Sequence, residues 1–403
     1  MIHRTSPDLN ALDISSILRS RATRREFEDA VATVAGARHG LAFAYGHAAF
    51  YALLKVLNLT GAEVILPAYT CRIMPEVVVA TGNTPVFADI DLSDYNMDLD
   101  ALKSAITTQT KVIVATHMFG YPADVDAIRE IATDKSVIIV EDAALMFPRS
   151  VHDLGGLRGD VGLFSFGPGK PLFTIRGGAM ITSDAALYER LRSYRDEAMN
   201  DLPSKEWVKR WMLLMWHYLV SHETVYGMTQ RLGFSKKGLH ALTSRLRPSS
   251  DGARHPASLI PGDFATRFTD FQARLGLVQL RKADRVCSCH QTLTKRYDEA
   301  LHGISNLTPA PVVEGASYAL YPVRVKNRDA IHFIQKMRAR GIETARVFND
   351  LSNLTRFQRY ARDSYPRAEQ AGREAVSLPV HTGLTEQQTH YIADGIRQVL
   401  ANT

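Results

Sequence analysis

The chain has 403 residues, of which 45% are hydrophobic and 22% are charged, a usage typical of soluble globular enzymes. Three cysteines exclude a disulfide framework, and the pair Cys287 and Cys289 is too sparse for a zinc site, so we expect a reducing, cytoplasmic setting and no metal. The formal net charge of +6 raises the question of a nucleic-acid partner, so the position of the excess charge matters.

Strand and helix patterns alternate through the first half of the chain. Residues 8–35 predict helix and, with the residues before them, an N-terminal arm of the small domain at 1–35. A short strand at 41–45 is followed by a helix, and the alternation continues with strands at 63–66, 85–89, 111–116 and 136–141 and helices at 71–81, 98–107 and 124–132. This alternation of strands and helices is typical of a mostly parallel sheet whose strands are joined by crossover helices.

Gly46 lies between the strand at 41–45 and the helix that follows it. Such a turn is an anion site, because free N–H groups and the helix dipole point outward there. We expect Gly46, His47 and Ala48 to bind a phosphate; the alternative is an ordinary connection between a strand and a helix.

The apolar run 137–140 predicts a strand that is covered on both faces and that ends at Asp142. Ligands bind at this edge of open α/β sheets. In pyridoxal phosphate enzymes a carboxylate there faces the protonated ring nitrogen, and a lysine on a later loop binds the aldehyde as a Schiff base. If Asp142 has this role, a lysine that forms the Schiff base must lie further along the chain.

Lys170 is that candidate. It follows a strand that ends near Ser165 and precedes Gly177-Gly178 and the strand 179–182. Glycines around the loop let backbone approach a bulky group closely. The alternative is a solvated cation at a loop tip.

The excess positive charge lies in one segment, because residues 203–260 carry nine Lys or Arg against three Asp or Glu and the rest of the chain carries 39 of each. The segment also contains Trp207, Trp211 and Trp216, in an apolar run that predicts a helix at 207–220. A helix of that length extends roughly 21 Å and cannot cross a bilayer core of about 30 Å. It can lie in an interface or pack in protein, and its aliphatic run argues against nucleic acid.

The remaining elements are a charged helix at 184–202, a long loop at 248–263 and a helix at 269–303. Beyond them we expect strands at 318–325 and 342–347 and helices at 329–340 and 385–400.

Several ordered motifs resemble those of the DegT/DnrJ/EryC1/StrS sugar aminotransferases from about residue 25 onward. They are Gly46-His-Ala-Ala49, Val64-Ile-Leu-Pro-Ala-Tyr-Thr70, Pro85-Val-Phe-Ala-Asp-Ile-Asp91, Tyr95-Asn-Met-Asp98, His117-Met-Phe-Gly120, Glu141-Asp-Ala-Ala144, Ser165-Phe166 with Lys170, Arg267-Phe-Thr-Asp-Phe-Gln272 and Leu378-Pro-Val-His381. The resemblance implies the α/β architecture of fold-type I pyridoxal phosphate-dependent transferases. A large domain at 36–265, with a mostly parallel seven-stranded sheet sandwiched by helices and a basic, Trp-rich insertion at 203–260, would precede a smaller α+β domain at 266–403.

The resemblance also implies roles for single residues. Lys170 would hold pyridoxal 5'-phosphate and act as general base, Asp142 would keep the ring nitrogen protonated, and Ser165 would bind the phosphate together with the turn at Gly46, His47 and Ala48. Arg267 would reach the cofactor of a partner subunit in a homodimer. Five positions depart from the family pattern, namely His47 for Thr, Cys71 for the aromatic that stacks on the ring, Leu145 for Gln or His, Gly167 for His and Ala265 for Asn.

Three functions remain open at this stage. The resemblance implies transfer of an amino group from glutamate or glutamine to a keto-sugar, which is expected to be nucleotide-linked. The altered pocket and the basic segment suggest instead a lipid-linked or amphiphilic substrate and a peripheral membrane contact through 203–240, at the inner face of the membrane. The third hypothesis is a non-catalytic homologue. The N-terminus lacks the apolar core of a signal peptide, which agrees with a cytoplasmic location.

Overall fold

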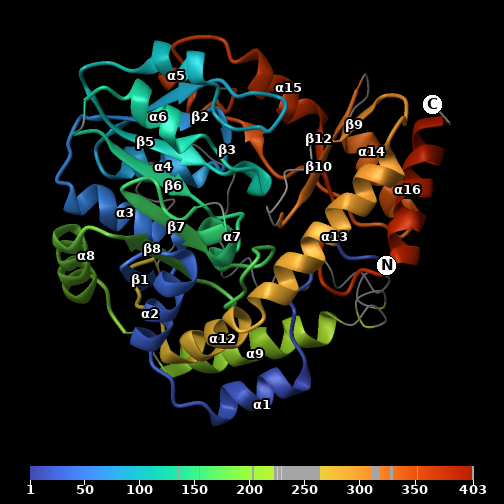
Figure 1. Cartoon of the computed structure of the whole chain (residues 1–403), viewed down its shortest axis with the longest axis horizontal. Coiled ribbons are helices and arrows are strands. Elements are labelled where there is room, and N and C mark those ends of the chain that lie inside the picture. The colour runs from blue at the N-terminus through green and yellow to red at the C-terminus, as the bar shows by residue number, and fades with distance from the viewer. Residues whose placement is uncertain are drawn as a thin grey trace.

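A seven-stranded sheet forms the centre of the larger part of the molecule (Figure 1). The computed structural model describes residues 1–134, 136–153, 155–201, 204–221, 225, 228, 264–309, 318–326, 330–351 and 353–401. The strand order is β1-β8-β7-β6-β5-β2-β4, and β8 alone runs antiparallel to its neighbours. The strands are β1 (His39–Phe43), β2 (Glu63–Pro67), β4 (Thr84–Ala88), β5 (Thr110–Thr116), β6 (Ile138–Asp142), β7 (Val161–Ser165) and β8 (Gly178–Thr182). The predicted mostly parallel sheet of seven strands is confirmed.

Helices cover both faces of this sheet, because alternate residues of a strand point to opposite sides. On β5, Val112 and Val114 belong to the core with α3 and α4, whereas Ile113 and Ala115 belong to the core with α5 and α6. The helices around this sheet are α2 (Arg24–Ala35), α3 (Gly46–Val56), α4 (Ile73–Ala80), α5 (Leu99–Ala105), α6 (Val125–Ile131), α7 (Pro148–Asp153) and α8 (Ala185–Ala198).

A smaller antiparallel sheet of order β12-β10-β9 lies at the other end of the molecule (Figure 1). Its elements are β9 (Leu307–Pro309), β10 (Tyr321–Val325), α14 (Ala330–Ala339), α15 (Pro366–Glu374), β12 (Ala375–Leu378) and α16 (Glu386–Ala401). The predicted continuous helix at 269–303 is wrong. The chain forms α12 (Asp270–Leu280) and α13 (Ala283–Leu301), and α13 runs from the large part into the small one.

The predicted strand at 342–347 is also wrong. This stretch pairs at single residues with two different partners, since Ile342 bridges to Ile2 and Ala345 bridges to Ser377. A short strand follows as β11 (Asn349–Asp350), which pairs with β3 (Tyr69–Thr70) in a separate two-stranded sheet and so joins this stretch to the segment that follows β2.

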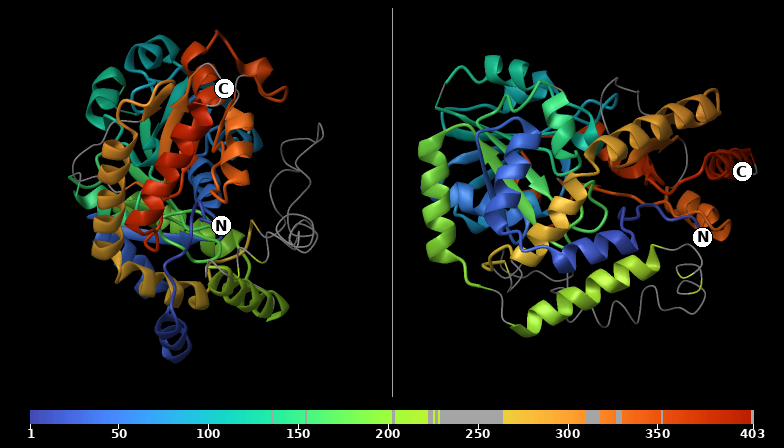
Figure 2. Two further views of the ribbon diagram at one scale, coloured as in Figure 1. Left: turned by 90° about the vertical axis from the view of Figure 1, so that its right-hand side faces the viewer. Right: turned by 60° about the horizontal axis from the view of Figure 1, so that its bottom comes forward.

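The helical N-terminal region predicted at 8–35 consists of two helices, α1 (Ala11–Arg19) and α2, because Thr23 starts α2 with a capping box. Helix α9 (Ser204–Val220) lies near α1 and α12 (Figure 2). The three share a core that includes Ile17, Leu214 and Leu275. None of the helices in the described part of the chain is both long and apolar enough to cross a membrane.

Candidate active site

Asp142 lies at the end of β6, at the edge of the sheet where β5 and β7 also end. Its side chain is 5% exposed, and one carboxylate oxygen accepts a hydrogen bond from the Ala144 N–H at 3.1 Å. Burial raises the pKa of Asp142, while the positive charge of Lys170 opposes that shift. A buried carboxylate in this position is stabilised by a cationic partner, which fits the protonated nitrogen of a pyridine ring.

Lys170 lies in the loop between β7 and β8. Its N–H donates to the Gly167 carbonyl at 3.2 Å, and Gly169 just before it has φ +78°, a conformation that favours glycine. Burial lowers the pKa of Lys170, although the Cys71 and Asp142 side chains favour the charged form. The structure therefore brings Lys170, Asp142 and Cys71 within electrostatic range of one another, and it favours a lysine that can act as a nucleophile or base.

The start of α3 and the end of β7 form a close cradle at the same edge. An ideal Cβ on Gly178 would lie 2.3 Å from the Gly46 nitrogen, and one on Gly46 would lie 3.2 Å from the Ser165 Cβ. The preceding residue, Tyr45, makes no side-chain hydrogen bond that caps the helix. The first turn of α3 therefore offers its positive dipole end beside the Ser165 hydroxyl, an arrangement that suits a phosphate.

The other residues of this turn pack tightly. His47 stacks between Tyr45 and Phe264, with ring centroids 4.8 and 5.4 Å away. The Ala48 N–H already donates to the Tyr45 carbonyl at 3.1 Å. Arg176, which the sequence did not single out, donates to the Tyr45 hydroxyl at 2.5 Å and places a cation beside the turn. Its only sequence signal is its position next to Gly177-Gly178.

A second buried pair fixes the strand ends beneath the site. The Nδ1 of His117 accepts a hydrogen bond from the Ala123 N–H at 3.0 Å, so the proton lies on Nε2 and is donated to Glu141 at 3.1 Å. Burial raises the pKa of Glu141, but hydrogen bonds to its carboxylate outweigh this and the net pKa is lowered. The backbone N–H of His117 also donates to the Asp142 carbonyl at 3.0 Å, which ties the end of β5 to the end of β6.

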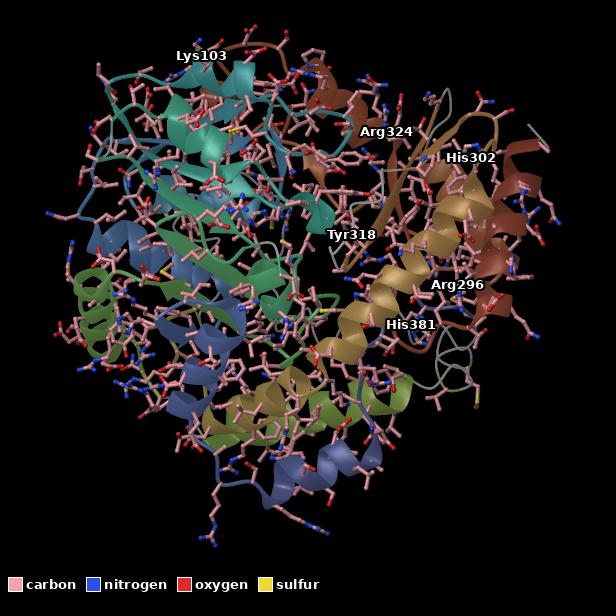
Figure 3. All side chains as sticks on the ribbon, in the orientation of Figure 1. Lys103, Arg296, His302, Tyr318, Arg324 and His381 are labelled. Atoms are coloured by element: carbon pink, nitrogen blue, oxygen red, sulfur yellow. The ribbon has the colours of Figure 1, made fainter. Side chains whose placement is uncertain are left out.

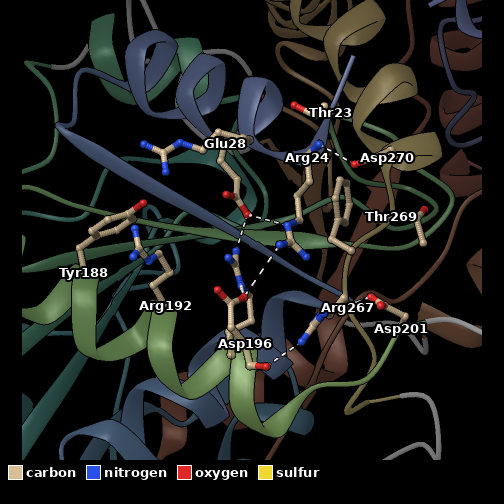
Figure 4. A pocket seen from close by; sticks show the side chains of 13 residues that line it. Thr23, Arg24, Glu28, Tyr188, Arg192, Asp196, Asp201, Arg267, Thr269 and Asp270 are labelled. Atoms are coloured by element: carbon tan, nitrogen blue, oxygen red, sulfur yellow. Dashed lines mark hydrogen bonds and ion pairs between the residues drawn. The ribbon is translucent and has the colours of Figure 1, made fainter. Parts of the chain in front are cut away.

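Arg267 lies elsewhere within this chain. It lines a hollow of about 620 Å³ whose walls contain five arginines, Arg24, Arg25, Arg192, Arg195 and Arg267 (Figure 4). Its guanidinium donates to the Asp196 carbonyl at 2.6 Å and lies 3.3 Å from the Asp201 carboxylate. Lys170 does not line this hollow, so a role of Arg267 at the cofactor of a partner subunit stays a prediction.

A model of the DegT/DnrJ/EryC1/StrS aminotransferase family matches residues 3–237 and 238–397. The chain belongs to this family. It is a pyridoxal phosphate-dependent aminotransferase. The residues at the sheet edge fit the cofactor, because a buried carboxylate, an amine of lowered pKa and a phosphate cradle lie together there.

Curated DegT/DnrJ/EryC1/StrS relatives match along most of their length. GDP-perosamine synthase of Caulobacter vibrioides is 27% identical over 385 residues, 93% of this chain and 89% of the relative. The UDP-N-acetyl-3-dehydro-alpha-D-glucosamine 3-aminotransferase of Acidithiobacillus ferrooxidans is 28% identical over 96% of this chain and 91% of its own.

Solved structures agree on the fold. The aminotransferase TlmJ from Streptoalloteichus hindustanus has a TM-score of 0.76 at 23% identity, with 100% of this chain and 99% of the other covered. A putative sugar aminotransferase of Streptococcus pneumoniae, Spr1654 in its PMP form, has a TM-score of 0.75 at 23% identity and full coverage of both chains.

Besides His47, four positions predicted to depart from the DegT/DnrJ/EryC1/StrS pattern have different surroundings. Cys71 is half-buried near Lys170, and burial raises the pKa of its thiol. Leu145 is 5% exposed and belongs to the main core, whereas Ala265 is exposed. Gly167 borders open space. The predicted loss of polar and aromatic contacts from the pocket, relative to the family pattern, stays a prediction.

Proposed function

We propose that the enzyme transfers an amino group from glutamate or glutamine to a keto-sugar carried by a nucleotide. The observation that carries this proposal is the convergence of Lys170, Asp142 and the Gly46 cradle at one edge of the sheet. The names of the relatives from Caulobacter vibrioides and Acidithiobacillus ferrooxidans refer to a GDP-linked and a UDP-linked sugar, and they support the choice of acceptor.

Pyridoxal phosphate, when bound, supplies the electron sink that weakens the bond to hydrogen at the reacting carbon. Asp142 would keep the ring nitrogen protonated, and the His117–Glu141 pair keeps the end of β6 in place. Lys170 would hold the cofactor through its amine and, once the amino donor has taken its place, would act as the base that moves the proton at the reacting carbon. Its lowered pKa favours this role, because a free lysine is a poor base at neutral pH. Ser165 and the first turn of α3 would hold the phosphate.

The test is to replace Lys170. Lys170→Ala should lose the adduct that borohydride traps between cofactor and protein, and it should lower the turnover number by at least about 10²- to 10⁴-fold, the usual contribution of a positioned base. The matched control is Lys103→Ala on α5, an exposed lysine at the periphery (Figure 3). Peptide mapping by mass spectrometry identifies the modified lysine. An adduct on any other lysine contradicts the assignment.

A second candidate acceptor, a lipid-linked or amphiphilic substrate, is favoured by one surface. Helix α9 exposes an apolar stripe made by Val208, Met212, Met215 and Leu219, with exposed fractions of 55, 63, 37 and 47%. These spacings place the four side chains along one side of the helix. Such a stripe suits a peripheral contact with the inner, cytoplasmic face of the membrane. Part of the predicted contact region at 203–240, including Arg231, Lys236 and Lys237, lies outside the described residues.

We further propose that the functional unit is a homodimer in which Arg267 serves the partner's site. The support is the position of Arg267 in an arginine-rich hollow that Lys170 of the same chain does not reach.

A further inference from the structure

Thr116 is a buried polar residue at the carboxyl end of β5, next to the strand that ends at Asp142. It is 6% exposed. Within the part of the chain that the structure describes, its hydroxyl oxygen has no hydrogen-bond partner. A buried hydroxyl without a partner costs free energy, and folded proteins satisfy the large majority of such groups. The fold alone therefore gives no reason for a threonine at this position.

The sheet places Thr116 beside Asp142 and on the same face. The two residues are direct partners in the parallel pairing of β5 with β6, and adjacent strands lie about 4.8 Å apart. Alternate residues of a strand share a face, and Val114 and Val140, two residues before each partner, belong to the same core as Ala48 of α3. Both side chains therefore point to the side of the sheet that carries the first turn of α3.

The Asp142 carboxylate can accept a further hydrogen bond. Its two oxygens offer about four acceptor positions, and one oxygen accepts from the Ala144 N–H at 3.1 Å. Burial raises the pKa of Asp142, and the charge of Lys170, the bond from Ala144 and the charge of His117 oppose that shift. A hydroxyl that donates to the carboxylate stabilises the ionised form in the same way. Rotation about the Cα–Cβ bond of Thr116 turns its hydroxyl without moving the strand.

We propose that Thr116 is a positioning residue for Asp142, whose carboxylate it holds by a hydrogen bond when pyridoxal phosphate is bound. A hydrogen bond to an ionised group is roughly twice as strong as one between neutral groups, which offsets the cost of burying a hydroxyl that finds no partner within the fold. The inference rests on the proposed function, because that function requires Asp142 to keep the ring nitrogen protonated. It predicts that the hydroxyl of Thr116 serves cofactor binding and not the stability of the fold.

The experiment first separates these two roles by unfolding the cofactor-free protein in urea. Thr116→Val keeps the shape of the side chain and removes the hydroxyl. The matched control is Thr110→Val at the other end of β5, where the hydroxyl oxygen accepts from the Thr107 N–H at 3.0 Å. Thr116→Val should not lower the urea midpoint, because no hydrogen bond within the fold is lost, whereas Thr110→Val should lower it.

Calorimetry with pyridoxal phosphate and the cofactor-free protein then measures affinity. The dissociation constant should rise about 10- to 100-fold in Thr116→Val, the usual effect of losing a hydrogen bond to a charged group. Thr116→Ser keeps a hydroxyl at the same position and should bind with nearly the wild-type constant. Thr110→Val should also bind like wild type, since its hydroxyl lies at the opposite end of the strand.

A pH titration of the visible absorbance of lysine-bound pyridoxal phosphate tests the link to Asp142. A proton on the ring nitrogen disfavours a second positive charge at the bond to Lys170, so it lowers the pH midpoint of this band. Thr116→Val should raise the midpoint, and Thr116→Ser should restore it. Lys170, His117 and Cys71 are the other ionisable groups whose charges interact with Asp142, and these variants leave all three in place.

The inference is wrong if Thr116→Val binds pyridoxal phosphate and titrates like wild type. It is also wrong if Thr116→Val lowers the urea midpoint as much as Thr110→Val does, because the hydroxyl would then serve the fold. Loss of affinity in Thr116→Ser equal to that in Thr116→Val would likewise show that the hydroxyl is not the group that matters. If wild type shows no lysine-bound band, the proposed function itself fails.

Discussion

The absence of a side chain at Gly178 sets how closely β8 approaches the first turn of α3. The sequence predicted that Gly177-Gly178 allows a close backbone approach, but not that Gly46 is the group approached. That contact depends on the pairing of β8 with both β1 and β7, and strand pairing between residues so far apart leaves no local signal. The contact of Arg176 with Tyr45 was missed for the same reason, because the two residues are 131 positions apart in the sequence.

Gly178→Ala should therefore weaken both the fold and the phosphate site. Its Cβ would lie 2.3 Å from the Gly46 nitrogen, so α3 must move, and forced overpacking of this kind costs about 1–3 kcal/mol of unfolding free energy. The matched control is Gly167→Ala in the loop between β7 and β8, where a Cβ would meet open space. Urea denaturation and pyridoxal phosphate titration measure the two effects. If the two variants have the same unfolding free energy and the same affinity for pyridoxal phosphate, the cradle is not tightly packed.

Helix α9 has two apolar sides with different surroundings. On one side Trp211 packs 4.6 Å from Phe271, Leu214 is fully buried and Arg210 is hydrogen-bonded to Gln272 in the interior. His217 contacts Phe173 of the lysine loop, and burial lowers its pKa to about 4. Part of the predicted basic, Trp-rich segment is thus structural, because its side chains hold the lysine loop. Only the exposed apolar stripe on the other side of α9 is available, within the described residues, for the proposed membrane contact.

Flotation with anionic liposomes at low salt tests that stripe. Wild type should float with the vesicles, and Met212→Glu combined with Leu219→Glu should not, because two carboxylates replace apolar contacts and repel the surface. Ile331→Glu on α14, at a residue that is 48% exposed, is the control for a charge added elsewhere. Circular dichroism verifies that all variants fold. Wild type that stays in the aqueous fraction argues against the membrane contact and leaves the nucleotide-linked acceptor.

Helices and strands were predictable where the hydrophobic pattern of the segment itself determines its structure. They were missed where the structure depends on which distant segments pair with it. The apolar runs before Asp142 and after Gly178 predicted buried strands, and both are strands of the central sheet. The stretch at 342–347 has a strand-like sequence, but Ile342 and Ala345 pair with different partners and no continuous ladder forms. The break between α12 and α13 at Arg281 and Lys282 carries neither Gly nor Pro, so no helix-stop signal marks it.

Across the whole molecule, the candidate site is assembled from segments that only the complete fold brings together. A small cavity beside Lys170 is lined by Thr5 from the first residues, His290 from α13 and His381 from the turn after β12. The proximity of Asp142 and Lys170 was predictable, because the proposed chemistry needs these two residue types in this order along the chain. The positions of Thr5 and His290 were not, since a lone threonine and a lone histidine carry no motif.

The same reasoning extends to a second copy of the chain. If Arg267 completes the phosphate site of a partner, Lys170→Ala and Arg267→Ala inactivate different halves of each site, and mixing the two inactive proteins restores activity. Random reassortment into dimers should give about a quarter of the wild-type activity per subunit, because half of the dimers are mixed and each mixed dimer holds one intact site.

Light scattering must first show a dimer, and a brief incubation at low denaturant concentration allows the subunits to exchange. The control mixes Lys170→Ala with Asp142→Ala. It should stay inactive, because both residues belong to the same half of a site and neither protomer of the mixed dimer keeps both of them. Activity from a monomer, or no recovery on mixing the single variants after exchange is verified, would place Arg267 outside the site.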